Sequence, residues 1–524
     1  MPKRWFGAIV LVAGLGVLTA GEPATQPAKV KITISRETTY LLGPVAKDGT
    51  IHYMTALNER FRQGITRENN AAVLLMQAFG PAYVNEAVLR KTLDELGIAE
   101  LPAEGKYFLD FIGFEREFSQ SARQSDDSRN LTDLRSKAMA GPWKPGDYPE
   151  IAAWLEKNTE SLALIVAASK RSRYYMPLVS ASDPPRMHDF ALPRLSLLRD
   201  ASRALMARAM RKAGAGDMEG AAADLLAVHR LARLTGGNPL LIERLVAVAM
   251  ESLACKADQA LAIRGKWTAV QARNMLKELE GLKPVADMAE AIDIGERCFL
   301  LDCLMLCARE GFGRLAAIGV DGAKELESLD ARQLDWDLIL RQFNSWYDRI
   351  VKAGRCPTHS QRQAELEQVD KDFRAFSQDF TAKLLEKYSS PEQMISWAGK
   401  AIADGKDSTR REVSQTIGNL LLTVLMPSLK RGFVMYDRGT TQMDLARLAV
   451  ALAAYKAEKG TYPERLAELS PGLLKQVPKD RFNDKDLVYK REGKGYLLYS
   501  VSENLTDDGG KDDPNEGDIV VRAE

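Results

Sequence analysis

The chain has 524 residues, which is long for one hydrophobic core and predicts two or three packed units. Hydrophobic residues make up 45% and charged residues 27%, proportions typical of a folded globular protein rather than a membrane-embedded or disordered one. Because 72 Lys and Arg residues nearly balance 71 Asp and Glu residues, the net charge of +1 provides no general attraction to nucleic acid or to an anionic membrane. We therefore expect no nucleic-acid partner.

The first 21 residues have the features of a secretory signal peptide, with Lys3 and Arg4 before an apolar run from Trp5 to Leu18. This run is shorter than the roughly 20 apolar residues that span a bilayer. We expect signal cleavage, a flexible linker at 22–29 and export to the periplasm or the extracellular space. The protein would then have no stable membrane span. An uncleaved signal that anchors it in the inner membrane is the alternative.

Residues 30–408 are expected to form a multi-helix body of one or two subdomains. Val30–Ser35 alternates like a lone β-strand, and Asp217 is placed to cap a helix that begins at Met218. Apolar spacing and Gly or Pro stops predict one or two helices within 148–167 and single helices at 66–79, 84–96, 195–212, 218–234, 239–262, 268–280, 285–310, 331–352, 361–387 and 409–426. The fold class predicted for the chain is therefore mainly α.

The five cysteines are Cys255, Cys298, Cys303, Cys307 and Cys356, an odd number that leaves at least one unpaired in a monomer. We expect small buried core residues, with one disulfide from Cys255 to the 298–307 helix as the alternative.

The four histidines are scattered and show no catalytic or metal-ligand spacing. His229 is expected to be a buried polar contact of its helix. Glu290, Asp293 and Glu296 share one helix face, which we interpret as an ionic surface beside Arg297. We find no catalytic signature, so no catalytic or cofactor-binding residue is assigned and the chain is interpreted as non-enzymatic.

Residues 409–439 are expected to form a connecting helix. After them the sequence pattern changes from consecutive helices to a helix followed by turns and strands. Within 440–524, a helix ends at Gly460 and a short turn follows with Leu466 and Leu469. Two aromatic-rich strands, 487–489 and 496–499, flank a five-residue connection, and 518–522 supplies a third strand. The tail therefore predicts a small α+β domain, one helix packed on a three-stranded antiparallel sheet.

This tail resembles the globular head of type II secretion pseudopilins. The matching elements are the helix into Gly460-Thr-Tyr-Pro463, Val477-Pro-Lys-Asp480, the tyrosine-containing strands and an acidic loop that closes on Asp518-Ile519. The resemblance implies a structural calcium ion in that loop, with Asp507, Asp508, Asp513 and Asp518 as ligands. Calcium prefers hard oxygen ligands, and a weakly binding extracellular site would have a Kd of about 0.1–1 mM. A solvated acidic turn is the alternative.

The N-terminus lacks the Gly-Phe type cleavage site and the following Glu through which pseudopilins assemble, so assembly into a pilus is not expected. As a whole, the chain resembles exported, mostly helical bacterial proteins that carry such a tail, which implies no activity. We expect an exported scaffold that binds an envelope or secreted protein. The alternatives are an envelope hydrolase with its site in a groove of the helical body, and an accessory component of a type II secretion-like assembly.

Overall fold

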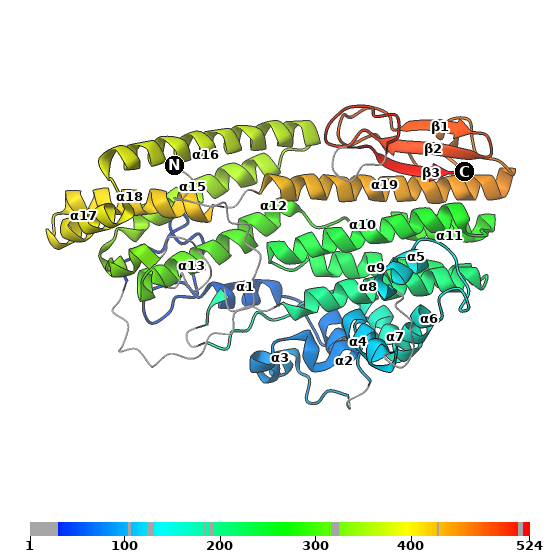
Figure 1. Cartoon of the computed structure of the whole chain (residues 1–524), viewed down its shortest axis with the longest axis horizontal. Helices are drawn as coiled ribbons and strands as arrows, with labels where there is room; N and C mark the ends of the chain where they lie inside the picture. Colours follow the sequence, from blue (N-terminus) through cyan, green and yellow to red (C-terminus); the bar gives the residue numbers. More distant parts are fainter. Residues whose placement is uncertain are drawn as a thin grey trace.

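The computed structural model describes residues 30–102, 106–122, 130–182, 185–187, 192–313, 315, 324–426, 429–511 and 517–524. These residues form a mainly helical protein with one small antiparallel sheet near the C-terminus (Figure 1), as predicted. None of the described helices combines the length and the apolar character that crossing a membrane requires.

The first half of the body contains short helices up to α7 and longer helices from α8 to α10. They are α1 (Tyr53–Phe61), α2 (Ala71–Phe79), α3 (Leu89–Leu96), α4 (Phe111–Ala122), α5 (Leu131–Met139), α6 (Pro149–Lys157), α7 (Thr159–Ser169), α8 (Pro193–Gly214), α9 (Met218–Gly236), α10 (Leu241–Arg264) and α11 (Ala269–Glu280). Local chemistry sets several boundaries: Asp217 accepts a hydrogen bond from the Gly220 amide at the start of α9, and Thr268 forms a capping box with Gln271 before α11.

The second half continues through α12 (Met288–Glu290), a π-helical turn (Ala291–Glu296), α13 (Arg297–Glu310), α15 (Trp336–Gly354), α16 (His359–Lys387), α17 (Pro391–Ala403), α18 (Asp407–Leu425) and α19 (Lys430–Lys459). The chain then forms a 3₁₀ turn (Leu466–Leu469) and the strands β1 (Val488–Glu492), β2 (Gly495–Ser500) and β3 (Ile519–Ala523). The strand order is β1-β2-β3, and both pairs are antiparallel.

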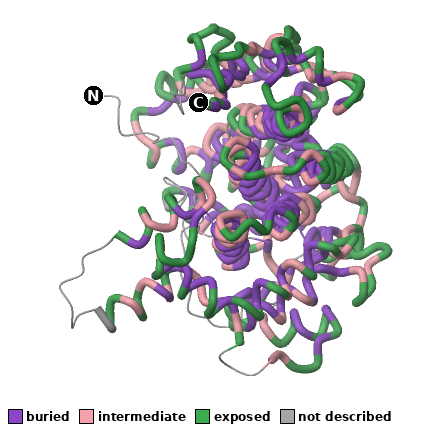
Figure 2. The backbone as a smooth tube through the Cα atoms, turned by 90° about the vertical axis from the view of Figure 1, so that its right-hand side faces the viewer, coloured by how far each residue is buried: buried purple, intermediate pink, exposed green. Residues whose placement is uncertain are grey.

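Two large hydrophobic cores hold these elements, and they do not follow chain order. One core joins α2, α7, α8, α9, α10 and α11 to α19 and the sheet, while the other joins α13, α15, α16, α17 and α18 to α1. Buried backbone concentrates along the central helices (Figure 2). Because α19 packs on α10 and α11 with one face and on β2 and β3 with another, it connects the C-terminal sheet to the body (Figure 1).

Several sequence predictions about local structure are wrong. Val30–Ser35 forms no strand, and Val30 instead fills the second core. The helix predicted at 285–310 is interrupted by a π-helical turn, where Gly295 lets the backbone approach the carbonyl of Pro239. The sequence analysis also missed α1, α4, α5 and α17, the last of which begins with Pro391 behind a Ser390 cap.

The C-terminal third differs from the prediction in two places. Residues 409–439, expected to form one connecting helix, belong to two helices, because α18 ends at Leu425 and α19 begins at Lys430. The hairpin connection has two residues rather than five, since Glu492 pairs with Gly495 and Gly493 adopts a positive φ of 57°.

The expected ionic surface around Arg297 is also wrong, because Asp293 and Arg297 are both buried. Arg297 Nη2 forms an ion pair with Asp293 Oδ1 at 2.9 Å, and the Tyr40 hydroxyl donates a hydrogen bond to the same oxygen at 2.7 Å. Arg355 reaches the other oxygen of Asp293 at 2.8 Å. The N-terminal segment therefore packs onto the π-helical turn through a buried polar network.

Candidate functional site

The first candidate site is the acidic loop between β2 and β3. Asp507 accepts hydrogen bonds from the Tyr499 hydroxyl at 2.7 Å and from the Gly509 amide at 3.0 Å. These bonds lower the pKa of Asp507, with the Tyr499 bond as the larger cause. Asp508 accepts from the Asn504 side-chain amide at 3.0 Å. Both carboxylates are therefore already engaged in ordering the loop.

Asp518 lies beneath this loop and is only 1% exposed. Its Oδ2 accepts from the Gly510 amide at 2.8 Å, whereas its Oδ1 is buried and has no hydrogen-bond partner among the described residues of the loop. Burial raises the pKa of Asp518, and the nearby carboxylates of Asp508 and Asp507 raise it further. The fourth expected ligand, Asp513, lies outside the described residues.

The loop thus matches a calcium site in one respect and departs from it in another. The unpartnered Oδ1 of Asp518 would suit a cation, because a buried carboxylate oxygen without a partner costs free energy. However, across the described chain only one group of three or more His, Cys, Asp or Glu side chains brings its ligand atoms within 4.8 Å of one another, and it does not include Asp507, Asp508 or Asp518.

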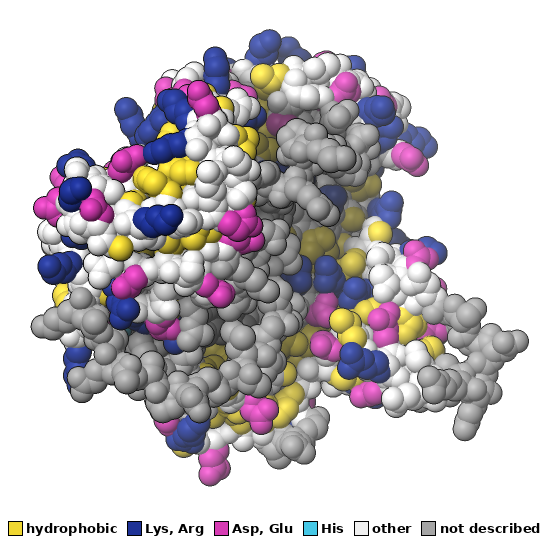
Figure 3. Space-filling model, turned by 60° about the vertical axis from the view of Figure 1, so that its left-hand side comes forward, with side chains coloured by type: hydrophobic (Ala, Val, Ile, Leu, Met, Phe, Trp, Pro, Cys, Tyr) yellow, Lys and Arg dark blue, Asp and Glu magenta, His cyan; other side chains and the backbone are white. Residues whose placement is uncertain are grey.

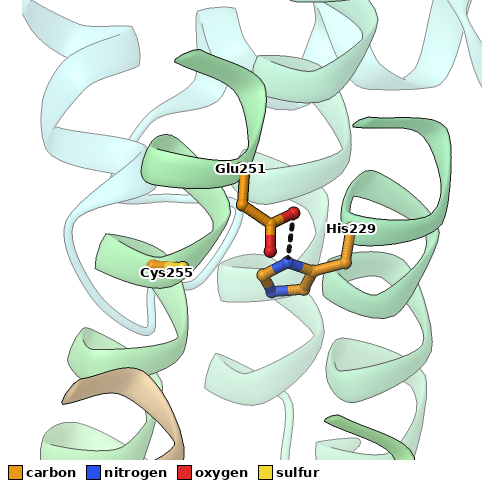
Figure 4. Close-up of side chains that lie close together, drawn as sticks. All are labelled: His229, Glu251 and Cys255. Atoms are coloured by element: carbon orange, nitrogen blue, oxygen red, sulfur yellow. Dashed lines mark ion pairs between the residues drawn. The ribbon is translucent and has the colours of Figure 1, made fainter. Parts of the chain in front are cut away.

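That group is His229, Glu251 and Cys255, in the seam between α9 and α10 (Figure 4). Glu251 and Cys255 lie one turn apart on α10, and the His229 ring extends from α9 toward Glu251 (Figure 4). His229 and Cys255 are 0% exposed, and Glu251 is 2% exposed.

The His229 ring lies between two carboxylates. Its Nε2 is 2.7 Å from Asp258 Oδ2, and its Nδ1 is 3.0 Å from Glu251 Oε2. The second contact is an ion pair without hydrogen-bond geometry, so Nδ1 has no hydrogen-bond partner. Arg233 donates from Nη1 to Glu251 Oε2 at 2.7 Å and to the His229 carbonyl at 3.0 Å.

Electrostatics favour charged groups in this seam. Burial by itself would lower the pKa of His229, but the charges of Glu251 and Asp258 outweigh burial and raise the pKa to about 9. Burial raises the pKa of Asp258, whereas His229 and Arg233 lower the pKa of Glu251 against the effect of burial. Burial and the two carboxylates hold the pKa of the Cys255 thiol well above its usual value.

The contacts between His229, Arg233 and the two carboxylates leave two carboxylate oxygens unused. Among the described residues, Glu251 Oε1 and Asp258 Oδ1 are buried and have no hydrogen-bond partner. Each such atom costs about 1–3 kcal/mol. The arrangement can act in two ways. Its nitrogen, oxygen and sulfur atoms can coordinate a metal ion, or a protonated His229 can form ion pairs with Glu251 and Asp258.

The expectation that His229 is a buried polar contact of its helix is confirmed, but the sequence analysis missed its partners. The available signal was the spacing of Glu251, Cys255 and Asp258 at i, i+4 and i+7, which places them on one face of a helix. The face that meets His229 depends on how α9 and α10 pack, which the periodicity of either helix alone does not specify.

The cysteines behave mostly as core residues. Cys255, Cys298, Cys303 and Cys307 are buried, Cys356 is partly buried, and all five are free thiols. The alternative of a disulfide from Cys255 to the 298–307 helix is wrong, because Cys255 packs in a cluster with Met443 and Ala446 of α19 and Cys298 lies in the second core.

A polar groove of about 460 Å³ lies at the starts of α15 and α18. Two of its carboxylates accept hydrogen bonds from the surrounding backbone: Asp335 accepts from the Leu338 amide, and Asp337 accepts from the Thr33 amide at 2.8 Å. Arg410 and Arg411 add positive charge. On the face shown in Figure 3, positive and negative side chains are interspersed rather than gathered in one patch.

Comparison with known proteins adds no further assignment. No family model, no curated protein and no solved structure matches the chain.

Proposed function

We propose that the protein is an exported, non-enzymatic scaffold that binds an envelope or secreted protein, with a pseudopilin-like C-terminal unit stabilised by calcium. One observation carries the proposal: charged side chains buried in the body pair with one another across helix seams. Arg194 contacts Glu243 at 2.8 Å, and Arg208 contacts Asp224 at 2.7 Å. These charged side chains form ion pairs that hold α8 against α9 and α10.

The C-terminal unit supports the second half of the proposal. Its order of a long helix, a short 3₁₀ turn and a three-stranded antiparallel sheet agrees with the expected pseudopilin-like head. The buried, unpartnered Oδ1 of Asp518 supports a cation in the adjoining loop. The enzymatic alternative draws no comparable support from the polar groove, since Asp335 and Asp337 accept backbone hydrogen bonds there.

The scaffold role predicts a discrete partner at the exposed apolar positions. Val270 on α11 is 68% exposed and Leu505 beside the acidic loop is 56% exposed. A photoreactive residue at either position, introduced in cells that make the protein, should give one crosslinked adduct that mass spectrometry identifies. The exposed Lys277, also on α11, is the control position. Loss of all specific adducts at both apolar positions would contradict the role.

Calcium should raise the melting temperature of the protein. With a Kd of about 0.1–1 mM, 10 mM calcium would add about 1–3 kcal/mol to the free energy of unfolding. Differential scanning fluorimetry with calcium and then with a chelator measures the shift. Asp507→Asn and Asp518→Asn should each reduce it, because each removes a negative charge from the loop.

The matched control is Asp486→Asn, an exposed aspartate of the same unit outside the loop, which should leave the calcium shift unchanged. An equal shift in all three variants would assign calcium binding to another place. No shift in the wild type would leave the loop as an acidic turn and contradict the calcium part of the proposal.

A further inference from the structure

The seam between α9 and α10 contains more potential metal-ligand atoms than its ion pairs and hydrogen bonds use. Among the described residues, Glu251 Oε1 has no hydrogen-bond partner, His229 Nδ1 has only its ion-pair contact with Glu251 Oε2 at 3.0 Å, and the Cys255 thiol lies beside them. All three side chains are at least 98% buried, so water does not compensate them from bulk solvent. A ligand that accepts lone pairs from nitrogen, oxygen and sulfur at once would satisfy this set.

We propose that His229, Glu251 and Cys255 bind a divalent transition-metal ion of the zinc type in the interior of the helical body. The ligand atoms lie within 4.8 Å of one another, whereas ligands around a tetrahedral zinc ion lie about 3.3–3.8 Å apart. Small side-chain movements would close this difference. Three protein ligands leave one coordination position of a tetrahedral ion for a further ligand.

The surroundings already have the arrangement that supports metal ligands. A metal-bound histidine usually donates its second ring N–H to a carboxylate, and Asp258 Oδ2 lies 2.7 Å from His229 Nε2. Ligating carboxylates are usually hydrogen-bonded as well, and Arg233 holds Glu251 Oε2 at 2.7 Å while Oε1 stays unpartnered. Asp258 and Arg233 are therefore positioning residues for the two ligands.

The net charge of the buried site does not change when the metal ion binds. Without metal, the positive His229 and Arg233 balance the negative Glu251 and Asp258 beside a neutral Cys255 thiol. A divalent ion that binds neutral imidazole and thiolate displaces one proton from His229 and one from Cys255, and both protons leave to solvent. The +2 charge of the ion offsets the two protons that leave, so the five groups and the ion together sum to zero and binding places no net charge in the interior.

This site and the acidic loop are expected to prefer different ions, because their ligand atoms differ. Thiolate and imidazole select borderline and soft ions such as zinc, whereas calcium and magnesium prefer all-oxygen sites. The two sites would therefore respond to different ions, and loss of calcium binding would leave the interior site intact.

The test uses the full chain, unfolded with a chelator and refolded with cobalt(II) or zinc, because a buried site is loaded most readily during folding. The refolded wild type should hold one ion per chain. Cobalt should show a sulfur-to-cobalt charge-transfer band and the visible absorption of a tetrahedral ion. Zinc should raise the melting temperature.

Cys255→Ser should remove the charge-transfer band, whereas Cys298→Ser, a buried cysteine of the other core, should keep it. X-ray absorption of the zinc-loaded wild type should show one sulfur among nitrogen and oxygen ligands, a measurement independent of whether a variant folds. A wild type that refolds without binding an ion, or a band that persists in Cys255→Ser, would overturn the proposal.

Discussion

Replacing His229 with leucine is expected to lower the free energy of unfolding of the metal-free protein by about 3–5 kcal/mol, the usual cost of removing one partner from a buried ion pair. The ring is 0% exposed and is the cation shared by Glu251 and Asp258. Arg233 still pairs with Glu251, so the loss falls mainly on Asp258. Chemical denaturation in the presence of a chelator measures the effect.

A double-mutant cycle separates the ion pair from the loss of packing. Asp258→Leu alone should also destabilise the protein, but the double variant His229→Leu/Asp258→Leu should lose less than the sum of the single losses, because no charge is left unpaired. His52→Leu, a substitution at a half-buried histidine, should change stability by no more than about 0.5 kcal/mol. Strictly additive losses at His229 and Asp258 would show that their pairing contributes nothing.

The stability of the metal-free protein is expected to fall as pH rises from about 6.5 to 9. His229 has a pKa of about 9 in the folded chain, against about 6.5 when unfolded. A group whose folded pKa is raised contributes fully below its unfolded pKa and loses that contribution as pH passes its folded value. The raised pKa corresponds to about 3 kcal/mol, lost across this window.

Denaturation midpoints at a series of pH values, with chelator present, measure this slope. Asp258→Asn should reduce the slope, because one of the two carboxylates that raise the pKa of His229 is gone. Glu296 adds a separate fall in stability at lower pH. Burial raises its pKa to about 7, so its contribution to stability is lost as pH rises from about 4.5 to 7. A wild-type stability that stays flat between pH 6.5 and 9 would contradict the charged state assigned to His229.

Local sequence signals predicted most of the helices but not how they meet. The Asp217 cap, the Gly460 stop and the buried face of Leu445, Leu448 and Leu452 depend on neighbouring residues, and the structure has all of them. The π-helical turn contains Gly295, which the carbonyl of Pro239 from a distant segment approaches closely, and no local pattern reports that approach.

The candidate sites show the same division. An acidic loop is visible as a run of neighbouring Asp and Gly residues, so Asp507 and Asp508 could be proposed directly. The His229 seam joins residues of two helices, and its chemistry appears only when α9 and α10 are packed together. Glu251, Cys255 and Asp258 were visible as one stripe, but a stripe does not show what it faces.

The position of α19 has a consequence for how the chain matures. A ribosome makes α10 and α11 long before α19, yet Leu445, Leu448 and Leu452 complete the core that those helices begin. Until α19 emerges, the nascent body keeps an apolar surface uncovered, because Met443 and Ala446 of α19 cover Cys255 on α10. The first core is therefore completed only after α19 has been synthesised, and α19 joins the three-stranded sheet to that core.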